Sequence, residues 1–177
     1  MNIDFSGLEK RDLIALIKLF TECDDERADA NDALQVGIQK FEAAGAWRPL
    51  VSAFGRANDM LVGALQAAVA NYVARAKAGE RDELVYLDGL VKLDDREAIN
   101  LFDLSDDSVA ALLGHEMTLS AAMFGASETL IRKLTPADAR PGALVTEWVS
   151  VMNEVRERSN AEVRRILSAR PHGAKLN

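Results

Sequence analysis

The sequence predicts an all-α fold: a multi-helix bundle of about six to seven helices, with one corner like a helix-turn-helix. Three observations support this prediction. Apolar residues recur about every three to four positions, which is the period of an amphipathic helix. Aromatic residues are only 6% of the chain while Ala and Leu are abundant, a composition that suits closely packed helices. Glycine and proline gather between the periodic segments, where chains turn.

The first two helices are expected at residues 7–23 and 31–44. The acidic run at 24–26 ends the apolar pattern between them, and Gly45 supplies the cap of the second helix. The stripe of the first helix consists of Leu13, Leu16, Ile17 and Phe20.

A third, longer helix is expected at residues 49–78, opened by Pro49 and stopped by Gly79. It carries a ridge of small residues: Gly55, Gly63, Ala64, Ala67 and Ala70. Because glycine is unfavourable inside a helix, this ridge predicts that another helix passes close to it, within the chain or across a dimer.

Short helices are predicted at 84–93 and 96–102, and no segment reads as a convincing strand. Ser105 has the side chain of an N-cap, so a longer helix is expected to begin there and to run to Leu134. The predicted organisation is a helical domain at 1–134, a linker at 135–142, and an amphipathic helix with a tail at 143–177.

The chain is expected to be a soluble cytoplasmic protein. Its single cysteine, Cys23, allows no disulfide within the chain, and its first residues lack the pattern of a signal peptide. The longest apolar stretch, Met60 to Ala74, contains Gln66 and Asn71 and is too short and too polar to cross a membrane. We therefore expect no membrane partner.

No set of residues predicts an active site, a metal site or a cofactor, so we expect a protein that is not an enzyme. His115 and Glu116 are adjacent and point about 100° apart on a helix, so they do not form one ligand site. Cys23 lies beside acidic residues that raise the pKa of its thiol, which argues against a nucleophile. Phosphate loops and calcium loops are not found.

Charge is distributed unevenly along the chain. The net charge is −7, and residues 1–107 hold 21 acidic against 12 basic residues, whereas residues 108–177 hold 7 against 9. An acidic surface repels phosphate, so binding to nucleic acid is expected only together with a partner. The candidate nucleic-acid contacts on the last helix are Arg156, Arg158, Arg164 and Arg165. This helix is either a solvent-facing terminal helix or an arm that docks on a partner.

Residues 96–113 have the pattern of a helix-turn-helix, in which Val109 and Leu112 pack back on the first helix, or of an ordinary helical corner. The wider stretch from Leu84 to Leu134 resembles the D subunit of the flagellar master transcriptional activator (FlhD-type proteins). The residues that carry the resemblance are Leu84, Tyr86, Leu87, Lys92, Leu93, Ala98, Phe102, Leu104, Ser105, Val109, Ala110, Leu113, Gly114, Thr118, Leu119 and Ala126.

The resemblance implies a helical subunit that forms dimers and activates transcription with a second protein, which supplies most of the DNA contacts. We therefore expect a bacterial regulatory subunit that acts by protein–protein contact, or alternatively a helical adaptor, immunity or assembly protein that binds a basic partner. A homo-oligomer, above all a homodimer, is expected. The candidate partner-binding residues are Tyr86, Leu87, Leu90, Phe102, Trp148 and Met152.

Overall fold

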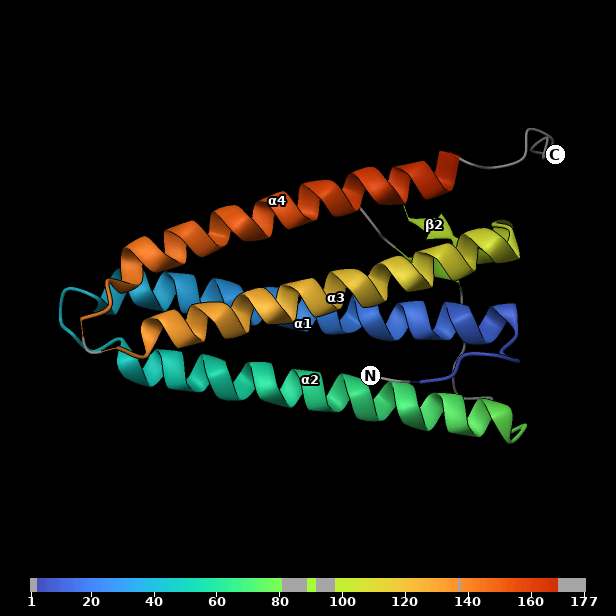
Figure 1. Ribbon diagram of the computed structural model, residues 1–177, viewed down its shortest axis with the longest axis horizontal. Helices are drawn as coiled ribbons and strands as arrows, with labels where there is room; N and C mark the ends of the chain where they lie inside the picture. The colour runs from blue at the N-terminus through green and yellow to red at the C-terminus, as the bar shows by residue number, and fades with distance from the viewer. Residues whose placement is uncertain (1–2, 81–88, 92–97, 137, 169–177) are drawn as a thin grey trace.

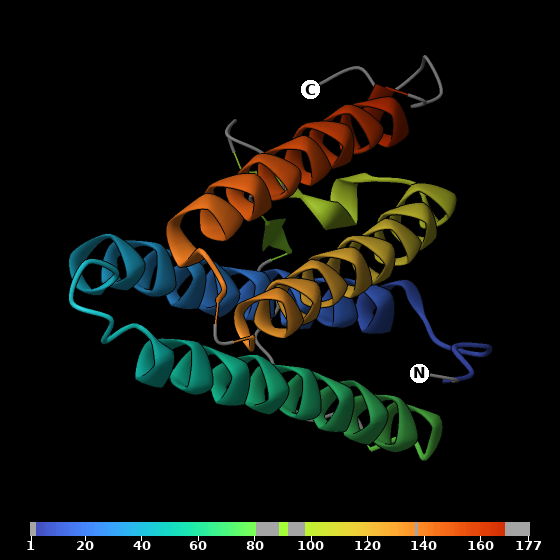
Figure 2. The same cartoon turned by 60° about the vertical axis from the view of Figure 1, so that its left-hand side comes forward.

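The computed structural model describes residues 3–80, 89–91, 98–136 and 138–168, and it confirms the all-α class. The described residues form four long helices, not six to seven. These are α1 (Lys10–Phe41), α2 (Arg48–Lys77), α3 (Asp106–Leu134) and α4 (Pro141–Ser168). Successive helices run in opposite directions (Figure 1). The inner helices α1 and α3 pack on each other, with α2 and α4 on the outside (Figure 2).

The helix α1 is continuous, so the break predicted at residues 24–26 is wrong. The inward positions in its second half are Cys23, Arg27, Asn31, Leu34 and Ile38. These positions keep the helical spacing, but Arg27 and Asn31 are polar. The apolar pattern is therefore interrupted at a point where the helix itself continues. Arg27 Nη2 also donates a hydrogen bond to Asp24 Oδ1 at 2.9 Å, which offsets one of the acidic charges.

The helix α2 lies within a residue of the predicted bounds, with Pro49 in its first turn. Gly45 and Gly79, on either side of it, have φ angles of +64° and +79°. Only glycine adopts such angles without strain, which explains why both turns form there. The break predicted at residues 135–142 coincides with the end of α3 and the start of α4.

A small β-hairpin replaces the two predicted short helices. The strands β1 (Leu90–Val91) and β2 (Ile99–Asn100) pair antiparallel, and the 3-10 helix η1 (Leu101–Asp103) follows. Gly89 has a φ of +69°, and a Cβ there would lie 2.4 Å from Phe102 Cδ2, so a side chain at this position would disrupt the packing. The remaining positions of the two predicted helices, 84–88, 92–93 and 96–97, lie outside the described residues.

The helix-turn-helix corner predicted at residues 96–113 is wrong in the part of the chain that the structure describes. A strand and a 3-10 turn, not a helix, lead into Ser105. The second half of the prediction is confirmed. Ser105 caps α3 by accepting a hydrogen bond from Ser108 N at 3.1 Å, and Val109 and Leu112 are fully buried.

Two apolar clusters fill the ends of the bundle. The first cluster surrounds Ile14, Val69 and Val109 at the end that carries the hairpin, and the second surrounds Ile38 and Trp148 at the other end. Lys10 Nζ holds η1 against α1 by donating to the backbone oxygens of Phe102 and Leu104.

Candidate functional site

Between the two apolar clusters lies a layer of buried polar side chains to which all four helices contribute, which we call the polar layer. It consists of Asp24, Arg27, Asn31, Asn58, Glu116, Ser120 and Ser159. Apart from Asp24, whose side chain is 16% exposed, each of these residues is less than 9% exposed. Burying polar groups is unfavourable unless they are paired, so this layer is where the bundle departs from a simple apolar core.

The ion pair of Asp24 and Arg27 is the charged centre of the polar layer. Arg27 is 3% exposed, and its guanidinium carbon lies 5.9 Å from the centre of the Phe124 ring on α3. Its Nε and Nη1 atoms have no hydrogen-bond partner among the described residues. Two donors of one buried cation are therefore left without an acceptor.

Glu116 faces this ion pair from α3. Burial, together with a smaller contribution from the nearby charge of Asp24, raises its pKa to about 7. Burial also raises the pKa of Asp24, more than its attraction to Arg27 lowers it. Glu116 therefore exchanges its proton near neutral pH, inside the bundle.

His115 points to a different neighbour, as the sequence predicts. Its Nε2 lies 2.7 Å from Ser159 Oγ on α4, and burial lowers the pKa of the imidazole. His115 therefore links α3 to α4, whereas Glu116 faces α1. No group of three or more His, Cys, Asp or Glu side chains within the described ranges is placed to hold a metal ion.

Cys23 is buried beside the polar layer. Burial is the main cause of the raised pKa of its thiol, and the charge of Asp24 adds to this effect. Because the thiolate is the reactive form, we expect the folded protein to react with a disulfide reagent such as DTNB at least about tenfold more slowly than the unfolded chain. Equal rates in the two states would show that the thiol is accessible.

A groove runs along the surface between α2 and α3, and we call it the α2/α3 groove. Its volume is about 940 Å³, and its floor is formed by Phe20, Leu65, Met117 and Phe124. Small residues line its sides, so no long side chains protrude over it there: Gly63, Gly114, Ala121 and Gly125. Two members of the polar layer, Asn58 and Ser120, also reach this groove.

The ridges on both sides of the α2/α3 groove are almost free of charge. From Met60 to Ala74 on α2, and from Ala110 to Gly125 on α3, every exposed side chain is uncharged. Most are Gly or Ala. The outer faces of α1 and α4 differ, since exposed charged residues lie on both: mainly acidic ones on α1, and acidic and basic ones on α4. A neutral surface of small residues along two helices is typical of a place where another helix packs closely.

The residues predicted to bind a partner fall in three places. Tyr86 and Leu87 lie outside the described residues. Leu90 and Phe102 are 49% and 41% exposed at the hairpin end of the bundle. Trp148 and Met152, each 6% exposed, are packed in the second apolar cluster, so they belong to the core of the chain and not to its surface.

The arginines predicted to contact nucleic acid are exposed on α4. Arg158 pairs with Glu154 at 3.5 Å and Arg165 with Glu162 at 2.6 Å, so part of their charge is neutralised on the same helix. The α2/α3 groove was not predicted as a site. The ridge of small residues on α2 was its signal in the sequence, but the matching run on α3 was not recognised.

The small-residue ridge meets its predicted neighbour at one end only. A Cβ on Gly55 would lie 3.8 Å from the Ile131 side chain of α3, whereas a Cβ on Gly63 would meet nothing within 4 Å. The helices α2 and α3 thus touch near Gly55 and leave the groove open beyond it.

Comparison with known proteins finds no match: no family model, no curated protein and no solved structure is similar to this chain. Within the described ranges, α3 is the one helix that is long and apolar enough to cross a membrane by length and composition. The core helix of a bundle meets the same criterion, and the inward side of α3 packs in both apolar clusters.

Proposed function

We propose that this protein acts by protein–protein contact, as a helical adaptor or assembly protein, and that its α2/α3 groove receives one helix of a partner protein. The observation that carries the proposal is the groove itself, with its apolar floor and its walls of small residues. An amphipathic helix lays its apolar face into a groove of this kind. Small wall residues let the two backbones approach closely, which increases the packing contact.

The dimensions of the groove fit a helix. The α3 side extends from Gly114 to Glu128, which corresponds to about 20 Å, or about four helical turns. Asn58 also lines the groove, and its Oδ1 is buried without a hydrogen-bond partner in the described part of the chain. A donor on the partner helix reaches this oxygen only if the side chains over it shift.

Charge at one end of the groove favours a basic partner. Asp59 of α2 and Glu128 of α3 both line the groove, and because α2 and α3 run in opposite directions they lie at the same end. A Lys or Arg on the partner helix would pair with them. This agrees with the basic partner expected from the acidic composition of the chain.

A role in transcription remains a second proposal, supported by the resemblance of residues 84–134 to an activator subunit. Because residues 98–103 form a strand and a 3-10 turn and no α-helix, DNA contact in that role would come from the partner. The arginines of α4 would then add phosphate contacts. A gel-shift titration with and without the captured partner tests this proposal, and no shift in either case would contradict it.

The groove is tested by a pair of matched substitutions, Ala121→Glu in the groove and Ala161→Glu on the outer face of α4. Both residues are exposed alanines in long helices. Partners captured from native lysate by the wild-type chain are purified, and their affinity for each variant is measured by calorimetry. We expect Ala121→Glu to weaken binding at least about tenfold, because a charge is buried against an apolar face, and Ala161→Glu to leave it unchanged.

Equal binding by both variants would contradict the proposal, as would failure to capture any partner. The predicted homodimer is the competing occupant of the groove. Light scattering of the pure chain separates the two, because a dimer that Ala121→Glu converts to monomer would assign the groove to a second copy.

A further inference from the structure

We infer that a pocket between α3 and α4 binds a small neutral molecule, about the size of one aromatic ring, that carries a single hydrogen-bond acceptor. The pocket has a volume of about 250 Å³ and is mainly apolar. It lies between α3 and α4, and Gly125 is the one residue that it shares with the lining of the α2/α3 groove, so it is a site separate from the proposed docking surface.

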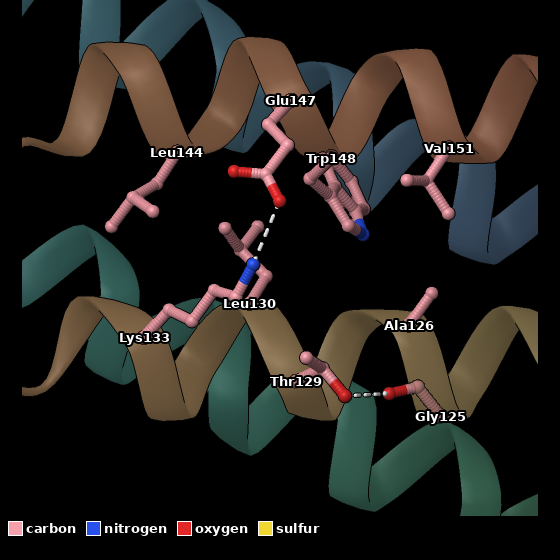
Figure 3. A pocket seen from close by; sticks show the side chains of 9 residues that line it. All are labelled: Gly125, Ala126, Thr129, Leu130, Lys133, Leu144, Glu147, Trp148 and Val151. Atoms are coloured by element: carbon pink, nitrogen blue, oxygen red, sulfur yellow. Dashed lines mark hydrogen bonds and ion pairs between the residues drawn. The ribbon is translucent and has the colours of Figure 1, made fainter.

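The side chains of two facing helices form the pocket (Figure 3). Leu130 of α3 and Trp148 of α4 form its floor, and both are almost fully buried. Gly125 and Ala126 leave the α3 side low, and a Cβ on Gly125 would meet nothing within 4 Å. Small residues at these positions keep a space open that larger side chains would fill.

The indole nitrogen of Trp148 supplies the polar feature of the pocket. The side chain is 6% exposed, and its Nε1 has no acceptor in the described part of the chain. In Figure 3 the indole enters the space between the helices with its nitrogen directed toward α3. A buried indole N–H usually has a hydrogen-bond partner, and this donor lacks one. Because the nitrogen itself is covered, a ligand reaches it only after the side chains over it shift.

Neighbouring acceptors are already engaged. Glu147 Oε1 accepts from Lys133 Nζ at 2.8 Å across the outer rim, and the Gly125 backbone oxygen accepts from Thr129 Oγ1 at 2.9 Å (Figure 3). Neither of these oxygens pairs with the Trp148 N–H, so a ligand that enters the pocket can supply the acceptor. The ion pair at the rim balances its own charge, which favours a neutral ligand.

The volume sets the size of the ligand. An apolar cavity of about 150 Å³ in another protein accommodates benzene, so about 250 Å³ admits one ring with a short substituent. A carbonyl oxygen next to the ring would reach the Trp148 N–H while the ring packs on Leu130. Aromatic ketones and related neutral carbonyl compounds are the class that fits.

The test uses acetophenone and α-methylstyrene, which have nearly the same shape but differ in the carbonyl acceptor. Each is titrated into the full chain labelled with ¹⁵N, and the two indole N–H signals are followed by NMR. We expect acetophenone to shift the Trp148 signal saturably and to bind about five- to tenfold tighter than α-methylstyrene. The Trp47 signal is the internal control and should not move.

The substitution Ala126→Leu fills the pocket from α3 and should weaken acetophenone binding at least about tenfold, while Ala161→Leu on the outer face of α4 should not. Three results would overturn the inference: no saturable shift of the Trp148 signal, equal affinity for the two probes, or unchanged binding in Ala126→Leu. Because the two probes are compared in the wild-type chain, the test stands even if Ala126→Leu fails to fold.

Discussion

Replacing Glu116 by Gln is expected to stabilise the protein at pH 8 and to change it little at pH 5. Burial raises the pKa of Glu116 from its ordinary value of 4.5 to about 7. Between pH 4.5 and pH 7, Glu116 is ionised in the unfolded chain but still protonated in the folded protein. The free energy of unfolding therefore falls as the pH rises through this range. Each pH unit in this window corresponds to 1.36 kcal/mol, and the whole effect is about 2–3 kcal/mol between pH 5 and pH 8.

Denaturant unfolding of the wild type and of Glu116→Gln at both pH values measures this effect. In thermal unfolding at pH 8, the melting temperature of the variant should be about 5–10 °C higher than that of the wild type. Asp24, whose pKa is also raised, adds a smaller dependence of the same sign that the variant retains. A parallel pH dependence in the two proteins would show that Glu116 is ionised in the folded state.

Replacing Arg27 by Met is expected to lower the free energy of unfolding by about 3–5 kcal/mol at pH 8, because a buried carboxylate then lacks its partner. The wild-type ion pair joins Arg27 Nη2 to Asp24 Oδ1 at 2.9 Å, with the Arg27 side chain 3% exposed. At pH 5 the loss should be smaller, since Asp24 has a raised pKa and takes up a proton more readily.

Two further variants isolate the cause of this loss. The double variant Arg27→Met, Asp24→Asn should recover part of the stability at pH 8, because no unpaired charge remains. Arg11→Met serves as the control on the same helix, since Arg11 pairs with Glu9 on an exposed surface and its loss should change stability little. Equal effects of Arg27→Met and Arg11→Met would contradict a buried ion pair.

The polar layer explains why the sequence predicts the fold class but not the number of helices. The positions of Leu13, Ile17 and Phe20 predict the first half of α1, and the layer then places Arg27 and Asn31 on the same inward stripe. A pattern based on apolar residues ends there, although the helix does not. Arg27 pairs with Asp24 on the same helix and lies against the Phe124 ring of α3, a contact far along the chain that an apolar pattern does not predict.

The hairpin was missed for a different reason. Its described strands are two residues long, too short to show an alternating pattern, and they depend on the turn conformation of Gly89. The N-cap Ser105 and the turn residues Gly45 and Pro49 act locally, so the sequence alone predicts them correctly.

The candidate site could be predicted only in part. Small residues on α2 indicated close approach of another helix, but which of them face a neighbour depends on the angle between α2 and α3. Gly55 meets Ile131, whereas Gly63 lines the open groove. The space around Trp148 also arises between two helices joined by a loop. The apolar stripe of the last helix predicted that Trp148 binds a partner, but it did not predict a pocket.

The most direct test of the docking groove is methyl NMR of the chain with ¹³C-labelled methionine, during titration with the captured partner. Met117 lines the groove and Met60, 73% exposed, lies on the α2 ridge, whereas Met152 is buried in the second apolar cluster. We predict that the Met117 and Met60 signals shift or broaden as the partner binds and that the Met152 signal stays in place. Binding that leaves the Met117 and Met60 signals unchanged would contradict a partner helix in the α2/α3 groove.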